Sequence, residues 1–345
     1  MIKKLIALAE KGYIPDLMIR LGIRSLLQRR IKELVSEDKT INLKNKQSFI
    51  NDMDAAPIAL VPDLANEQHY EIPAEFYNLC LGKNKKYSSC FWEKHTSNLD
   101  DAEDISLQLT AEHANLKDGL AILELGCGWG SLSLWMASHF PKASITSVSN
   151  SASQKAYITS EAKKRNINNL QVITCDMNDF STNEKFDRVV SVEMVEHMRN
   201  HRKLFANIKK WLKPEGYFMM HIFVHKSQPY LFEVKDDDDW MSKYFFSGGM
   251  MPSDDLPSFF QEDLTLKNTW RWSGEHYEQT ANAWLENIDA NKAKALTVLE
   301  KIYGKNNAVM WLNRWRIFFM ACAELWGYKG GKEWFVSHYL FKNGK

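Results

Sequence analysis

The sequence predicts an α/β protein whose core is a doubly wound sheet of seven strands. From residue 119 onward, short apolar segments of strand length alternate with amphipathic segments of helix length. This repeat of strand and helix places parallel strands in one sheet with helices on both faces. The chain before residue 119 reads as loop and helix, and the rhythm breaks after residue 225 into an irregular, aromatic-rich stretch. We therefore expect a core with a helical N-terminal segment and an aromatic cap.

The expected elements follow one another in a simple order. Residues 1–50 and 100–117 are predicted to be helical before the sheet begins. The expected strands cover residues 121–125, 144–148, 170–174, 186–192, 217–224, 264–272 and 334–341. The helices expected between and after them cover residues 130–139, 151–165, 199–212, 276–303 and 306–326, and Lys213–Gly216 is expected to close the third of these.

Composition and charge limit the classes of protein that fit. The 345 residues carry 44 Lys and Arg against 43 Asp and Glu, so the electrostatic reason to expect nucleic-acid binding is absent. The five cysteines form no C-x-x-C pair, so we expect neither a disulfide framework nor a zinc site, and a reducing, cytoplasmic location fits. No run approaches 18 apolar residues, so no membrane span is expected, and Glu10 interrupts the first apolar stretch too early for a signal peptide.

The N-terminal helical stretch is basic and amphipathic between residues 17 and 32. Apolar residues alternate there with Arg20, Arg24 and Arg30, while Gly22 weakens the prediction of one unbroken helix. Two interpretations stay open. The segment is either a helix that lies on the main domain with its arginines in solvent, or a helix that contacts a membrane surface.

A glycine loop after the first strand is the most specific motif. Glu124 is followed by Gly126, Gly128 and Gly130 and then by a helix, and glycines let a ligand approach the backbone closely. The pattern E-x-G-x-G-x-G resembles motif I of class I S-adenosylmethionine (SAM) methyltransferases, which have a Rossmann-like fold. A carboxylate beside this loop suits a cationic ligand better than a phosphate, so the sequence predicts SAM as the cofactor.

Residues after the second and third strands complete the predicted cofactor site. The resemblance implies that Asp176 faces the adenine amino group and that Met177 packs on the ring. The carboxylate that usually holds the ribose is missing, and Ser149, Asn150 and Gln154 are the candidates to replace it. These polar residues are also typical of a helix N-cap, and both roles stay open because they use different atoms.

The fourth strand ends in a group of ionisable residues. Glu193, Glu196 and His197 lie within five residues, where side chains of a parallel sheet point into the substrate crevice. Two carboxylates and a histidine beside a methyl donor form a candidate acid–base site. The alternative is a helix start with charged groups in solvent.

Several longer segments together resemble the coclaurine N-methyltransferase family, which is related to the cyclopropane fatty acyl phospholipid synthases. These segments are HYEIPAEF, KYSSCFW, SVEMVEHM, HIFVHK, DDDDW, SGEHYEQT and GYKGGKEWFVSHYLF, and the resemblance runs from about residue 65 to 343. It implies an antiparallel last strand and a reacting amine beside Glu193, Glu196 and His197. Further residues expected to bind are Tyr70 and Ser88 for the cofactor, and Glu71, His221, Trp240, Tyr277 and Trp284 for the substrate.

Two departures separate the chain from the synthases. The synthases bind bicarbonate with a cysteine that is Ser89 here, Cys90 coming one residue later, although the histidine of that site is present as His221. They also usually carry glycine where this chain has Glu193. We therefore expect N-methylation of a small, aromatic or alkaloid-like amine, with His197 as base and Glu193 or Glu196 orienting it. The alternatives are modification of unsaturated acyl chains at a membrane and a SAM-binding protein without catalysis.

This interpretation divides the chain into four parts. They are an N-terminal helical cover of the active site (1–110), the SAM-binding core (111–225), a cap and substrate-binding insertion with the sixth strand (226–305), and a C-terminal helix and strand that complete the sheet (306–345). The four consecutive aspartates at 236–239 predict a solvated acidic turn, because sequential aspartates rarely present ligands to one ion, and no metal is expected. The expected partner is a small-molecule amine, while peripheral membrane contact and a homodimer stay open.

Overall fold

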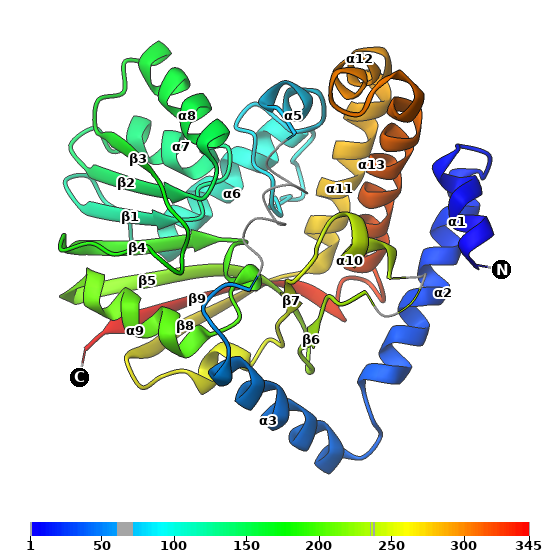
Figure 1. Ribbon diagram of the computed structural model, residues 1–345. Helices are drawn as coiled ribbons and strands as arrows, with labels where there is room; N and C mark the ends of the chain where they lie inside the picture. The colour runs from blue at the N-terminus through cyan, green and yellow to red at the C-terminus, as the bar shows by residue number, and fades with distance from the viewer. Residues whose placement is uncertain (1, 61–71, 235, 237–238, 345) are drawn as a thin grey trace.

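The computed structural model describes residues 2–60, 72–234, 236 and 239–344. Its centre is a seven-stranded sheet in the order β3-β2-β1-β4-β5-β9-β8 (Figure 1). The strands are β1 (Ala121–Leu125), β2 (Ser144–Ser149), β3 (Leu170–Thr174), β4 (Phe186–Val192), β5 (Leu212–His225), β8 (Leu264–Trp272) and β9 (Trp334–Asn343). β9 pairs antiparallel with both β5 and β8, while the pairs from β3 to β5 are parallel. The predicted seven-stranded sheet with an antiparallel last strand is confirmed.

Helices cover both faces of this sheet, because successive strand side chains point to opposite sides. On one face, Ile122 of β1 packs with α6 (Leu99–His113) and α7 (Ser131–His139). On the other face, Leu123 and Leu125 share a core with α3 (Lys39–Ala55) and α9 (His201–Trp211). α8 (Ala152–Lys164) packs beside β2 and β3. The alternation within β1 thus assigns each face its own helices.

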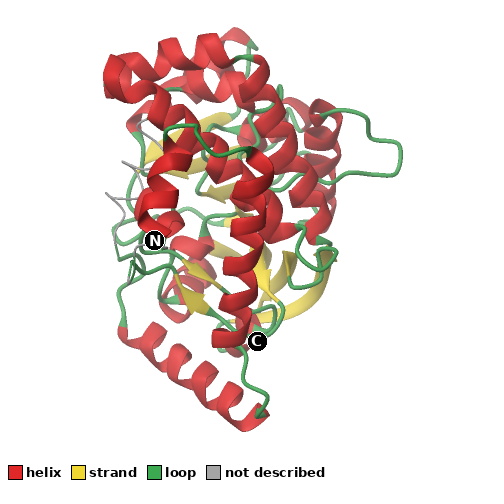
Figure 2. Ribbon diagram, turned by 90° about the vertical axis from the view of Figure 1, so that its right-hand side faces the viewer, coloured by secondary structure: helices red, strands yellow, loops and turns green. Residues whose placement is uncertain are grey.

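A helical layer lies beside the carboxyl ends of the parallel strands (Figure 1). It is made of α5 (Ala74–Cys80), α11 (Gly274–Ala290), α12 (Lys292–Tyr303) and α13 (Lys305–Trp326). In Figure 2 these helices stand in front of the sheet. Their largest buried side chains are aromatic and include Phe76, Trp284 and Trp315. This layer builds one wall around the end of the sheet where the predicted site lies.

The N-terminal region consists of α1 (Ile2–Glu10), α2 (Asp16–Leu34) and α3. Contrary to the sequence-based caution, α2 runs unbroken through Gly22; the turn comes instead at Gly12, whose φ is +78°. α2 lies along α13, where Arg20 donates to Glu324 at 2.9 Å. Among the described residues, no helix is long and apolar enough to cross a membrane.

The cap between β5 and β8 is short and irregular. It contains β6 (Tyr230–Leu231), α10 (Trp240–Tyr244), β7 (Met250–Met251) and the 3-10 turn η2 (Leu256–Phe259). Asp239, the last of the four aspartates, pairs with Arg30 of α2. Over the described part of the chain, no group of three or more His, Cys, Asp or Glu residues is arranged to hold a metal ion.

Two element boundaries differ from the sequence-based expectation. The helix expected over 276–303 is two helices, because Asn291 interrupts it and donates its side-chain amide to Leu79 O of α5 at 3.2 Å. The segment Lys213–Gly216, expected to close a helix, belongs to β5. There the register with β4 shifts between Phe186 and Arg188, so the extra residues are accommodated as an irregularity in the sheet.

Candidate active site

The glycine loop between β1 and α7 adopts a backbone that favours glycine. Gly126, Gly128 and Gly130 have φ of +78°, +51° and +80°. A Cβ on Gly126 would stand 2.4 Å from Cγ of Met194, whereas a Cβ on Gly128 would meet no atom within 4 Å. Gly126 therefore allows the loop to pack against the end of β4, and Gly128 leaves open space beside the backbone.

One pocket joins this loop to the ends of β2, β3 and β4. Its lining residues are Ala59, Gly126, Gly128, Val148, Ser149, Asn150, Gln154, Cys175, Asp176, Met177, Glu193, Met194, His197, Met198, Ser247 and Gly248. Nine of the predicted site residues are therefore brought together at one wall. Tyr70 and Glu71 lie outside the described residues. The predicted residues that do not line the pocket are Ser88, Glu124, Gly130, Glu196, His221, Trp240, Tyr277 and Trp284.

The polar residues after β2 were predicted either to cap the next helix or to bind the ribose, and different residues are placed for the two roles. Ser151 caps α8, its hydroxyl accepting from Gln154 N at 3.4 Å. Ser149 Oγ donates to Gln154 Oε1 at 2.6 Å, and Nε2 of Gln154 is buried without a hydrogen-bond partner among the described residues. Ser151 therefore provides the cap of α8. The side-chain amide of Gln154 is not used for capping, and its Nε2 group can donate to a ligand such as a ribose hydroxyl.

Glu124, which the motif predicted to contact the ligand, does not line the pocket. Its carboxylate is buried beneath the loop and accepts from Ser147 Oγ at 2.9 Å and from Ser133 Oγ. Burial raises the pKa of Glu124 to about 7. This carboxyl group ties β1 to β2 and to α7, so it supports the loop from behind.

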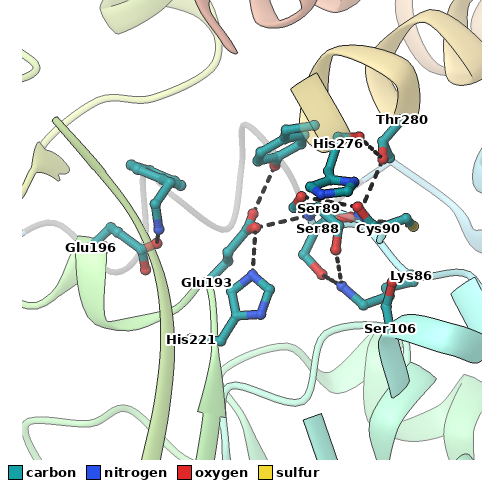
Figure 3. A network of polar contacts seen from close by, with 12 residues as sticks. Lys86, Ser88, Ser89, Cys90, Ser106, Glu193, Glu196, His221, His276 and Thr280 are labelled. Atoms are coloured by element: carbon teal, nitrogen blue, oxygen red, sulfur yellow. Dashed lines mark hydrogen bonds and ion pairs between the residues drawn. The ribbon is translucent and has the colours of Figure 1, made fainter. Parts of the chain in front are cut away.

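Glu193 stands at the centre of the polar network beyond β4 (Figure 3). Its carboxylate accepts three hydrogen bonds, from Ser89 N at 2.9 Å, His221 Nε2 at 3.1 Å and Tyr277 OH at 2.7 Å. Its φ is +47°, a conformation costly for a non-glycine residue, and its amide donates to His221 O at 2.8 Å. Burial raises the pKa of Glu193, and Lys86 opposes that shift. A strained backbone thus holds a carboxylate in a fixed direction.

Lys86 is a buried lysine that the sequence analysis missed. The residue is 2% exposed, and its ammonium donates to Ser88 Oγ at 2.6 Å and to Ser89 O (Figure 3). The loop is further held by Cys90 N, which donates to Thr280 Oγ1 at 3.1 Å. Lys86 therefore holds the carbonyl side of Ser89, the residue whose amide donates to Glu193. Lys86 follows Lys83 and Lys85 in a basic stretch that is typical of an exposed loop. Its burial comes from α6 and α11 packing around the loop, so no local pattern signals it.

Glu196 and His197 lie on the 3-10 turn η1 (Val195–His197) and face different ways. Oε1 of Glu196 accepts from Phe223 N on β5 at 2.8 Å, and burial raises the pKa of this carboxyl well above its usual value. His197 is half-buried at the pocket wall and stacks on Phe246 of the cap at 4.6 Å between ring centroids. Burial lowers its pKa to about 4, although Glu193 opposes the shift.

Two pocket residues without a chemical signal were also missed. Ala59 reaches the wall because its backbone exchanges two hydrogen bonds with the side chain of Asn178, at 3.0 and 3.1 Å. Gly248 comes from the cap, where its carbonyl accepts from Arg199 at 3.3 Å. Both positions depend on contacts between distant segments, so no local pattern could have marked them.

The fold, the glycine loop and the polar pocket beside it define the class of this protein as class I SAM-dependent methyltransferases. Comparison with known proteins agrees. Residues 62–330 match the family model described as mycolic acid cyclopropane synthetase. The chain is 35% identical to (S)-coclaurine N-methyltransferase of Thalictrum flavum subsp. glaucum, over 99% of this chain and 96% of that protein. It is also 32% identical to cyclopropane-fatty-acyl-phospholipid synthase of Escherichia coli over 65% of this chain and 56% of that one.

Solved structures give the same grouping. A crystal structure of coclaurine N-methyltransferase bound to N-methylheliamine and S-adenosylhomocysteine superposes with a TM-score of 0.96 at 34% identity, covering 99% of each chain. The cyclopropane synthase MmaA2 of Mycobacterium tuberculosis shares the fold with a TM-score of 0.68 at 20% identity, covering 81% of this chain and 98% of that one. The chain belongs to the coclaurine N-methyltransferase family, within the wider family of the cyclopropane synthetases.

Proposed function

We propose that this chain transfers the methyl group of SAM to the nitrogen of a small amine that carries an aromatic ring. The observation that carries the proposal is the position of Glu193, whose oriented carboxylate lines the same pocket as the glycine loop. A carboxylate there attracts an ammonium ion and gives no advantage to an alkene. The relatives named for coclaurine, pavine and tetrahydroprotoberberine N-methylation support an alkaloid-like amine.

The pocket residues fit SAM on two counts. Gly128 leaves room for a ligand to lie against the backbone, and the buried Gln154 amide retains a free donor. We assign the ribose to Ser149, Asn150 and Gln154, and the adenine to Asp176 and Met177, which all line the pocket. When bound, SAM supplies a methyl group that its sulfonium makes electrophilic.

The protein must turn an ammonium ion into a neutral amine whose lone pair is free. We assign the acceptance of the proton to Glu193, because burial raises the pKa of this carboxyl. The sequence made His197 the base, but an imidazole with a pKa of about 4 is a weak one. Neutral at pH 7, His197 is instead suited to accept a hydrogen bond from the amine and so direct its lone pair.

Aromatic side chains around His197 support an aromatic acceptor. Phe246 stacks on His197 and lies 5.5 Å from Phe223 and 4.8 Å from Phe232, measured between ring centroids. These rings come from β5 and the cap. None of them lines the pocket, but Phe232 and Phe246 are partly exposed, and we place the rings of the amine against them. A flat amine would bury its rings against these side chains while its nitrogen meets Glu193.

The test is methyl transfer from SAM to two kinds of acceptor, with products identified by mass. We expect turnover with aliphatic secondary amines that carry an aromatic ring, such as heliamine, and none with vesicles of unsaturated phospholipid. Glu193→Gln, which keeps the size of the side chain but not its charge, should lower kcat/KM for the amine by about 100-fold or more, the scale of a lost general base. Glu215→Gln serves as the control, because it makes the same change at an exposed carboxylate that pairs with Lys342 near the start of β5 and does not line the pocket.

Other outcomes of this experiment would favour one of the two alternative functions. Methylene added to the lipid, with dependence on bicarbonate, would favour acyl modification. Tight SAM binding without turnover on any acceptor would favour a protein that binds SAM without catalysis. The cytoplasmic location, the homodimer and the peripheral membrane contact stay predictions that this experiment does not address.

A further inference from the structure

We infer that His221, His338 and His113 form a proton relay that connects Glu193 with solvent. The inference rests on the proposed N-methylation, and it assigns to His338 and His113 a part in that reaction at a distance from the pocket. Both residues lie on elements that do not line the pocket, His338 on β9 and His113 at the end of α6.

The three rings lie one after another from the carboxylate outward, with hydrogen-bond contacts at both ends of the series and ring packing between His221 and His338. Nε2 of His221 is 3.1 Å from Oε1 of Glu193, and the His221 and His338 ring centroids are 4.5 Å apart. Nδ1 of His338 is 2.7 Å from Nδ1 of His113. His221 and His338 are fully buried, while His113 is half-buried against Trp270, so the series ends at the edge of the protein.

Two ring nitrogens in this series make no hydrogen bond with the described residues. They are Nδ1 of His221 and Nε2 of His338, and both are buried. Leaving a buried polar atom unpaired costs about 1–3 kcal/mol, and such atoms in a native fold call for an explanation. They belong to adjoining rings, where a small rotation or one intervening water molecule completes the connection between them.

The relay moves one proton without leaving a net charge on any ring. A proton on Glu193 passes to Nε2 of His221, and the Nδ1 proton of that ring passes to Nε2 of His338. The Nδ1 proton of His338 then passes to Nδ1 of His113, whose Nε2 proton leaves to solvent. Each ring gives up one proton and receives one, so each ring ends in its other tautomer. Glu193 ends as the carboxylate that accepts from His221 Nε2–H, which is the contact observed at 3.1 Å. Before the next turnover, exchange of each ring's proton between its two nitrogens through water restores the starting tautomers.

The surroundings keep these rings neutral, as such a transfer requires. Burial lowers the pKa of all three histidines, and Lys86 lowers those of His221 and His338 further. Glu112 next to His113 acts in the opposite direction, and the tryptophans Trp270 and Trp272 that contact the rings are uncharged. Methylation of an ammonium ion releases one proton per turnover, so a buried Glu193 must lose that proton before the next cycle.

The test breaks the relay at its two outer members. His113→Ala removes the surface end, and His338→Phe keeps an aromatic ring while removing both nitrogens. The matched control is His139→Ala, because exposed His139 stacks on Trp135 at 4.0 Å much as His113 stacks on Trp270 at 4.1 Å, yet lies outside the series. The substrate is the amine that the wild type methylates fastest, and melting temperatures identify any variant that is misfolded.

We expect kcat to fall at least tenfold in both relay variants, with a larger solvent isotope effect in D₂O and KM for the amine within twofold. Free imidazole should restore much of kcat in His113→Ala, because it replaces a proton carrier at an accessible position. A second readout needs no methyl transfer: with S-adenosylhomocysteine bound, a pH-indicator dye follows the proton released when the amine binds, and this release should slow in His113→Ala but not in His139→Ala.

The two proposals fail in different ways. If the wild type methylates no amine, N-methylation is refuted. If it methylates an amine and His113→Ala keeps the wild-type kcat, isotope effect and rate of proton release, the relay is refuted while N-methylation stands. Loss of kcat in His338→Phe alone, with His113→Ala unchanged, would also overturn the relay and make His338 a packing residue.

Discussion

The hydroxyl of Tyr277 donates to Oε2 of Glu193 at 2.7 Å, which joins α11 to the end of β4 directly behind the pocket. Tyr277 is itself held by Trp326 of α13, whose ring lies parallel to it at 4.7 Å. The helical layer therefore sets the direction of the carboxylate. Substitutions in this arrangement give predictions that separate positioning from chemistry.

Tyr277→Phe should lower kcat/KM for the amine by about 10-fold to 100-fold, the scale of a hydrogen bond to a charged group. Removing a donor that favours the carboxylate raises the pKa of Glu193 further, so the acid side of the pH profile should move to higher pH. Steady-state kinetics between pH 6 and 9 measure both effects. Tyr339→Phe is the control, because it removes a buried hydroxyl bonded to Asp254 O in the same protein. An unshifted profile in Tyr277→Phe would contradict the assigned role.

Gly128→Ala should weaken SAM binding by tenfold or more, since the added methyl group enters the open space where the ligand is expected. The positive φ also strains the backbone at a cost of about 1 kcal/mol. Gly119→Ala is a matched control, because Gly119 has a φ of +81° and equally open surroundings but precedes β1, at the opposite end of that strand from the loop. Calorimetry should show similar losses in melting temperature but a loss of SAM affinity only at Gly128. Equal SAM affinity in the two variants would remove the loop from the cofactor site.

His197→Ala should lower kcat by about 10-fold, the scale of one lost hydrogen bond, while leaving SAM affinity nearly unchanged, because the imidazole is assigned to the acceptor amine. The pKa of about 4 means that His197 is already neutral throughout the neutral range. The pH profile of the wild type should therefore show no inflection near 6.5 that disappears in His197→Ala. An inflection at 6.5 that the substitution abolishes would return the role of base to His197.

The unfolding free energy should fall as pH rises from about 4.5 to about 7, because the buried carboxyl of Glu124 loses its proton in this range. Its folded pKa is raised to about 7 from 4.5, so the folded state binds more protons in this window and the benefit is complete only below 4.5. The shift corresponds to about 3 kcal/mol of unfolding free energy. Glu124→Gln, which keeps partners for Ser133 and Ser147, should flatten this dependence. Urea titrations at pH 5 and pH 8 measure the change in unfolding free energy between these pH values for the wild type and for Glu124→Gln. An equal change in the two proteins would refute the prediction.

Much of the fold could be predicted because its signals are local. The strands β1, β3 and β4 match their expected residues, since each is a short apolar run bounded by polar or glycine residues. The break at Asn291 and the strand through Lys213–Gly216 were not predicted. There, contacts with α5 and β4 outweigh local helix preference.

The sequence by itself determined the glycine loop, the polar residues after β2 and β3, and the presence of Glu193 and His197 at the end of β4, because chain neighbours and parallel strand ends meet by geometry alone. Tertiary structure decided what those residues do. The donors to Glu193 come from Ser89, 104 residues before it, and from Tyr277, 84 residues after it. Burial raises the pKa of Glu124 beneath the loop and lowers the pKa of His197. This burial likewise arises only when distant helices cover the sheet. Desolvation and hydrogen-bond direction are properties of the packed molecule, and no local pattern encodes them.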